Sequence, residues 1–187
     1  MRSTPIVAVL LLAACGDNVS STEDARKAYL GLDPSVDKAI SLGFQGFNTS
    51  SNGANISPQS ADGGTSGTMT VTGLVDQGSS SNKNMNLDEA LSNYSDDGKL
   101  TYKTDAAALP ALDISLKNFP NGTLDGTLTG SFIMSGDLGG QVSLALTFTG
   151  QTEAGPTAGT VLRKPGTTHI TGTATSPAGT YNVNVTR

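Results

Sequence analysis

The stretch QVSLALTFT at residues 141–149 decides the fold, because large apolar and short side chains alternate along it with a period of two. Its large apolar residues are Val142, Leu144, Leu146 and Phe148. Successive side chains of a β-strand point to opposite faces of the sheet. The pattern therefore predicts a strand with one buried face and one face of short polar side chains.

The same alternation recurs on both sides of this stretch, from residue 67 to residue 187. It is seen at residues 67–75, 112–117, 124–134, 170–174 and 181–185. Turn-forming residues fall between these runs, as at Asp97-Gly98 and Pro120-Asn121-Gly122. Residues 67–187 are predicted to form an antiparallel β region of about eight strands, joined mostly by tight turns.

The composition agrees with a β protein. The chain has 24 Thr, 20 Ser and 23 Gly among 187 residues, and only 5% of its residues are aromatic. Long helical bundles are instead rich in Ala, Glu, Lys, Leu and Arg. A net charge of −5 with 11 Lys and Arg provides no basic surface for nucleic acid, so we expect no nucleic-acid partner.

A helical segment is predicted at residues 22–47. Ser20 and Glu23 have the spacing of a capping box, and Asp33 before Pro34 is typical of a second helix start. The second part carries an apolar stripe on one face, which is formed by Val36, Ala39, Ile40, Gly43, Phe44 and Phe47. We expect this stripe to pack against the sheet.

Two segments are harder to assign. Residues 48–66 are almost entirely small or polar, with Ile56 as the one large apolar side chain, and are predicted to be a flexible loop. Residues 85–94 fit either a helix or a strand. The turn signal that follows at Asp96-Asp97-Gly98 favours a strand.

Together these elements predict a mainly β fold with one domain. A long twisted antiparallel sheet tends to curl, and the helical stripe offers an apolar face to curl around. We expect a meander that forms a barrel-like or half-barrel sheet, with the N-terminal helical segment packed on it.

The N-terminus resembles the export signal of bacterial lipoproteins. Arg2 precedes a short apolar run at residues 6–12, which is too short to span a bilayer. The motif Leu12-Ala13-Ala14-Cys15 then resembles a lipobox, and Cys15 is the single cysteine of the chain. The resemblance covers this signal alone.

The resemblance implies that residues 1–14 are a signal peptide and that Cys15 is the lipidation site. In this class the thiol receives a diacylglycerol, the chain is cut before the cysteine, and the new amine takes a further fatty acid such as palmitate. Several acyl chains give stable membrane anchoring. Residues 15–21 would then be a polar tether in the cell envelope. An Asp directly after the cysteine resembles an inner-membrane retention signal, but Asp17 comes one place late, which favours the outer membrane in a diderm host.

Catalytic and metal-binding patterns are weak. The segment from Asn93 to Gly98 resembles half of a calcium loop, but Thr104 stands where such a loop needs a bidentate Glu, so a hairpin turn is favoured. His169 lies on the strand face opposite Ile170 and is expected to be exposed. We predict no catalytic residue, no metal site and no cofactor, and therefore a protein that is not an enzyme.

Two functions remain open. The first is a lipid-anchored domain with a structural or interaction role, meeting a protein or a glycan through its polar β surface. The second is a carrier of an apolar small molecule in a lipocalin-like half-barrel. The carrier hypothesis fails if the concave face of the sheet is filled by Ile40, Phe44, Phe47, Phe132 and Phe148.

Overall fold

The computed structural model describes residues 16–50, 55–76, 80–156 and 158–187, and within them the chain forms one helix and eleven strands. The helix is α1 (Thr22–Thr49). The strands are β1 (Asp17–Asn18), β2 (Asn55–Asp62), β3 (Ser66–Val75), β4 (Lys83–Ser95), β5 (Leu100–Lys103), β6 (Ala111–Lys117), β7 (Thr123–Gly136), β8 (Leu138–Ala154), β9 (Val161–Arg163), β10 (His169–Ser176) and β11 (Gly179–Thr186). The predicted β region holds nine of these strands, β3 to β11, where about eight are expected, and β2 lies outside it.

The long strands form an antiparallel meander. Their order is β2, β3, β4, β7, β8, β10 and β11, and β5 and β6 share the place between β4 and β7. The short strand β9 pairs with the end of β8, and β1 pairs with the beginning of β8 in parallel. The interpretation of residues 85–94 as a strand is confirmed, because they lie within β4.

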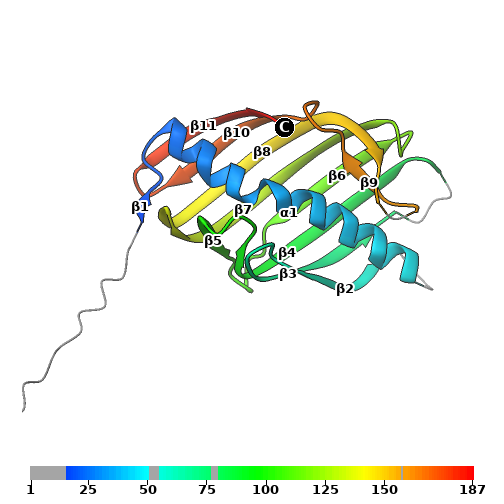
Figure 1. Ribbon diagram of the computed structural model, residues 1–187, viewed down its shortest axis with the longest axis horizontal. Coiled ribbons are helices and arrows are strands. Elements are labelled where there is room, and N and C mark those ends of the chain that lie inside the picture. The colour runs from blue at the N-terminus through cyan, green and yellow to red at the C-terminus, as the bar shows by residue number, and fades with distance from the viewer. Residues whose placement is uncertain (1–15, 51–54, 77–79, 157) are drawn as a thin grey trace, which may run out of the picture.

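The sheet curls around α1 without closing (Figure 1). The helix contacts both β2 and β11, which are the two edges of the meander and do not pair with each other. This arrangement is the half-barrel form of the predicted fold. Left-handed glycines help the strands bend, because at Gly73 and Gly172 φ is +129° and +147°, which other residues rarely adopt.

The concave face of the sheet is filled by side chains. Ile40, Phe132 and Phe148 are fully buried, Phe44 is nearly so, and Phe47 is partly buried against the same core. The helix approaches the sheet closely at Gly31, where a Cβ would lie 2.5 Å from the Tyr102 hydroxyl oxygen. That hydroxyl donates a 2.7 Å hydrogen bond to the carbonyl of Ala28.

The predicted break between two helices does not occur. Residues 22–49 form one continuous helix with Pro34 inside it, and Asp33 is a buried helical residue and not an N-cap. Proline removes one helical hydrogen bond, but the apolar faces on both sides of it are buried in the same core, which outweighs this loss. The helix begins at Thr22, as predicted, but its N-cap is Ser21 and not the Ser20 of the expected capping box, and the Asp24 amide donates to the Ser21 hydroxyl.

The predicted flexible loop at residues 48–66 is wrong for most of its length. Residues 55–62 form β2, which pairs with β3. Ile56 anchors this strand by packing at Gly46 of α1. A register shift between Ile56 and Gln59 accommodates Pro58, which is tolerated because β2 is an edge strand. Residues 51–54 lie outside the described structure.

The predicted tether at residues 15–21 is also wrong from residue 16 onward. Asp17 and Asn18 pair with β8, and Val19 is fully buried in the core. The folded domain therefore begins at Gly16, directly after Cys15. Among the described residues α1 is the one helix, and it has no apolar stretch long enough to cross a membrane.

Candidate functional site

The outer face of the sheet, opposite α1, presents short polar side chains in ordered rows. Strand pairing places one residue from each of six strands side by side. The first row is Asn86, Asp113, Thr127, Thr147, Thr171 and Asn184, and the second is Asn84, Ser115, Asp125, Thr149, His169 and Thr186. Neighbouring strands are spaced by about 4.8 Å, so the rows form a regular array of hydroxyl, amide and carboxylate groups.

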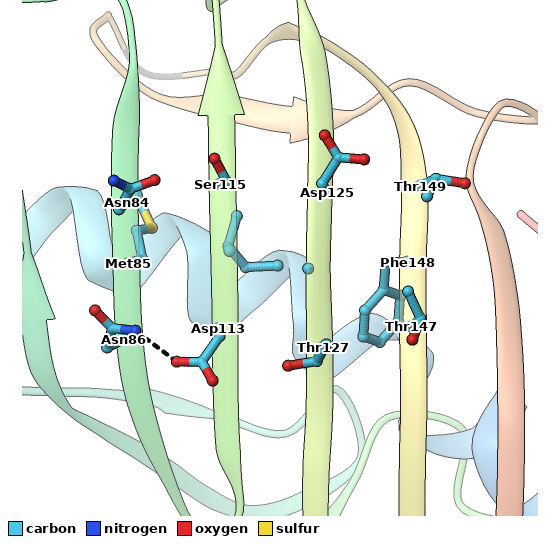
Figure 2. Close-up of a pocket in the computed structure, with 12 residues that line it drawn as sticks. Asn84, Met85, Asn86, Asp113, Ser115, Asp125, Thr127, Thr147, Phe148 and Thr149 are labelled. Carbon is cyan, nitrogen blue, oxygen red and sulfur yellow. Dashed lines mark hydrogen bonds between the residues drawn. The ribbon is translucent and has the colours of Figure 1, made fainter.

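A shallow hollow of about 540 Å³ lies on this face, over the part of both rows that runs from β4 to β8. Figure 2 shows the polar side chains that line it, with α1 behind the sheet. The Asn86 amide donates a 2.6 Å hydrogen bond to the Asp113 carboxylate across two strands. Asp125 is exposed on the next strand. We call these two rows and their hollow the outer polar face.

The outer polar face is suited to hydrogen bonding. Amides and hydroxyls both donate and accept, and the two carboxylates accept, as a sugar or a peptide backbone would require. His169 is exposed, as predicted, and its Nδ1 lies 3.1 Å from the Thr186 hydroxyl oxygen. Among the described residues, no three of the His, Cys, Asp or Glu side chains are grouped so that they could hold a metal ion.

The segment that resembled a calcium loop is a turn between β4 and β5. The Asp97 carboxylate accepts a 2.8 Å hydrogen bond from the amide of Lys99. The Asp96 carboxylate pairs with Lys38 of α1 and accepts from the Gly64 amide. These carboxylates fix the turn to the helix and to the β2–β3 connection, which supports the hairpin interpretation.

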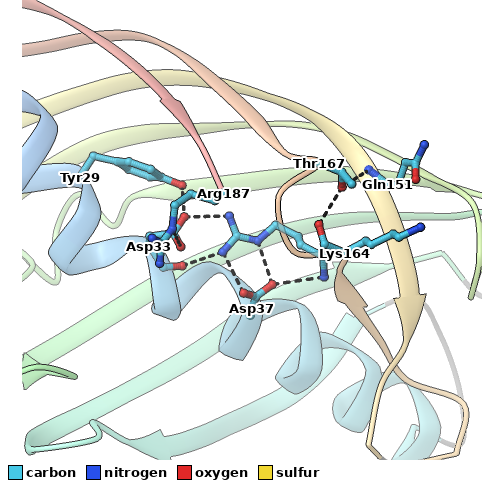
Figure 3. Close-up of polar contacts among 8 residues, drawn as sticks. Tyr29, Asp33, Asp37, Gln151, Lys164, Thr167 and Arg187 are labelled. Carbon is cyan, nitrogen blue, oxygen red and sulfur yellow. Dashed lines mark hydrogen bonds and ion pairs between the residues drawn. The ribbon is translucent and has the colours of Figure 1, made fainter.

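A buried ionic network joins α1 to the C-terminal part of the chain (Figure 3). The Arg163 guanidinium donates to Asp33 and to Asp37, in each case at 2.8 Å. Arg187 and the Tyr29 hydroxyl also donate to the Asp33 carboxylate. The side chains of Arg163 and Asp33 are only 4% and 5% exposed, so this pair is held away from solvent.

The network determines the charges of its members. Burial alone would raise the pKa of Asp33, but the hydrogen bonds and charge of Arg163 outweigh it and hold that pKa below its ordinary value. Burial also raises the pKa of Tyr29, and the neighbouring Asp33 charge adds to the shift. Since every charged group is paired, the network is a structural clasp between α1 and β9.

Glu89 is an acidic residue buried in the otherwise largely apolar core. It is fully buried on the concave side of β4, and neither carboxylate oxygen has a hydrogen-bond partner within the described structure. Burial raises its pKa to about 8. The burial of this position could be predicted from the sequence, because residue 89 shares its strand face with Met85, Leu87 and Leu91. The Arg163 network had no such signal, because its partners are up to 154 residues apart in the sequence.

The expected lipidation site, Cys15, lies outside the described residues. Its neighbour Gly16 is packed against the β7–β8 turn, where a Cβ would lie 2.3 Å from the carbonyl oxygen of Gly136. Comparison with protein-family models, with curated proteins and with solved structures finds no match to this chain.

Proposed function

We propose that this protein is a membrane-anchored bacterial lipoprotein of the cell envelope, with a structural or interaction role and no enzymatic activity. The observation that carries the proposal is the motif Leu12-Ala13-Ala14-Cys15, which ends in the single cysteine of the chain and directly precedes the first packed residue, Gly16. A diacylglycerol thioether on Cys15 and an acylated amine would anchor the domain stably. Asp17, one place late for retention, favours the outer membrane.

The outer polar face supports an interaction role. It is a broad surface of short side chains, and it carries the exposed carboxylates of Asp113 and Asp125 within the hollow. Short side chains lose little conformational entropy when they become ordered, which favours binding across a flat surface. We propose a protein or a glycan as the partner, recognised through hydrogen bonds to these rows.

The filled concave face argues against the alternative of an apolar-ligand carrier. Carriers of small molecules enclose a pocket of several hundred Å³ that is lined mainly by apolar side chains. Here the helix stripe and the aromatic rings of the sheet occupy that space, and Tyr102 and Phe132 meet edge to face at 6.4 Å between ring centroids. The interaction role is therefore the stronger hypothesis.

Lipidation is tested by Cys15→Ser in a diderm bacterial host fed an alkyne fatty acid. We expect the wild-type chain to be labelled and to fractionate with membranes, and the variant to lose both properties. A double variant, Cys15→Ser with Ser92→Cys, moves the single thiol to the exposed outer face of β4 and should stay unlabelled. Labelling of Cys15→Ser, or an unlabelled wild-type chain in the medium, would refute the proposal.

A further inference from the structure

We infer that the end of the molecule at which the chain enters the folded domain lies directly against the bilayer, so that the strands stand up from the membrane. This inference rests on the proposed lipid anchor at Cys15. We call this end the anchor end; it comprises β1, the beginning of α1, and the β4–β5 and β7–β8 turns. Its exposed charged residues include Asp17, Lys27, Asp97, Lys99 and Asp137, and Asp24 is half-buried beside them.

The first step is that Gly16, the residue after Cys15, is already packed against the domain. Gly16 is held by backbone contacts on two sides, because a Cβ at Gly139 would lie 2.5 Å from the Gly16 carbonyl oxygen. Val19 is fully buried, and its carbonyl accepts a 2.6 Å hydrogen bond from Ser176. Consecutive Cα atoms are about 3.8 Å apart, so an acylated Cys15 would hold the domain within one residue of the lipid.

The second step is the direction of the chain. Strand β1 runs parallel to β8, with Asp17 beside Leu138 and Asn18 beside Gly139. Strand β8 runs away from the β7–β8 turn, and β1 therefore does so too. The chain therefore reaches Asp17 from the side of that turn, where Gly16 packs against the carbonyl of Gly136. In Figure 1, β1 lies at one extremity of the molecule, beside the start of α1.

The third step is the chemistry of the anchor end. A hollow of about 440 Å³ lies there, lined by Asp17, Asp24, Lys27, Lys99 and Asp137 among others. Carboxylates and ammonium groups thus stand side by side. This mixture complements a zwitterionic headgroup layer, in which ammonium groups can meet the aspartates and phosphates can meet the lysines.

The orientation has a consequence for the proposed interaction role. Strand β7 has 14 residues, so it would extend the domain roughly 45 Å from the bilayer. With the strands upright, the outer polar face points sideways and stays open to partners in the envelope.

Site-resolved lysine acetylation tests the orientation. The acylated full chain is reconstituted into vesicles of phosphatidylcholine and phosphatidylethanolamine, treated with a membrane-impermeant acetylating reagent, and analysed by mass spectrometry for each lysine. We expect Lys27 and Lys99 to be modified several-fold less in vesicles than in detergent. Lys117 and Lys164 are the matched controls, because they are also exposed but lie near the opposite end, and their modification should not change.

A linker variant gives the second arm. Inserting about 12 Gly and Ser residues between Cys15 and Gly16 adds a reach of roughly 17–21 Å, and should restore modification of Lys27 and Lys99 in vesicles. Flotation and the mass of the N-terminal peptide are measured first. A chain that does not float and carries no acyl mass refutes the anchor itself. A chain that floats but shows no protection of Lys27 and Lys99 refutes the orientation alone.

Discussion

Glu89 is a single residue whose ionisation should control the stability of the whole domain. Its carboxyl group is fully buried and without a hydrogen-bond partner in the described structure, so the core stabilises the neutral form and raises the pKa to about 8 from an ordinary 4.5. Between these pH values the folded state keeps a proton that the unfolded state has lost. Unfolding then releases a proton, and stability must fall as the pH rises.

The test is Glu89→Gln, followed by thermal and denaturant unfolding from pH 4 to pH 9. In the wild type, Glu89 should lower the free energy of unfolding by about 1.4 kcal/mol per pH unit over most of the interval between the two pKa values. The variant should lose this slope and should be the more stable protein above pH 8. Asp88→Asn, at the adjacent exposed position, is the control and should leave the slope in place. An unchanged slope in Glu89→Gln would show that this carboxyl group is not held neutral.

The alternation along β4 already places residue 89 on the buried face, beside Met85, Leu87 and Leu91. What the sequence does not supply is the absence of a hydrogen-bond partner, which depends on the tertiary packing around this side chain. Residue-level periodicity predicts which way a side chain points, but not the environment that it meets.

At the scale of elements, α1 is held to the sheet by a charged clasp as well as by its apolar stripe. Asp33→Asn removes one carboxylate from the Arg163 network and leaves a buried guanidinium partly unpaired. Breaking such a pair costs about 3–5 kcal/mol of stability. Glu23→Gln is the control, because its 3.7 Å pair with Arg26 is exposed and should be worth about 0.5 kcal/mol or less. Equal melting temperatures for Asp33→Asn and the wild type would contradict a structural role for the clasp.

The elements differ in how far local sequence determines them. Apart from the three-residue β9, the strands from β3 to β11 follow a period of two that is visible in the chain, and so they could be predicted. Strand β2 could not, because its residues are mostly polar, and it is held by pairing with β3 and by contacts with α1 such as that of Ile56 at Gly46. The unbroken α1 was missed for a similar reason, since Pro34 is a local signal that tertiary packing overrides.

At the scale of the whole molecule, the sheet curls around α1, and this helix occupies the concave face. Both edge strands contact α1, so the apolar stripe is covered from both sides. The outer polar face, in contrast, is a broad surface that none of the described helices and strands covers. Its rows follow from strand register, which the alternation of single strands does not determine, and the sequence alone predicted a polar face but not its array.

Because the concave face is filled, we expect the purified protein to hold no apolar small molecule. Native mass spectrometry of the Cys15→Ser chain should give the mass of the polypeptide without apolar small molecules, because Phe44, Phe132 and Phe148 already fill the space that a ligand would need. Phe132→Ala is the matched variant. Truncating this fully buried ring should cost about 3–5 kcal/mol and leave an apolar cavity, which can take up a small hydrophobic probe such as benzene. Uptake of the probe by Phe132→Ala but not by the parent chain would support a filled core, whereas an apolar adduct on the parent chain would revive the carrier hypothesis.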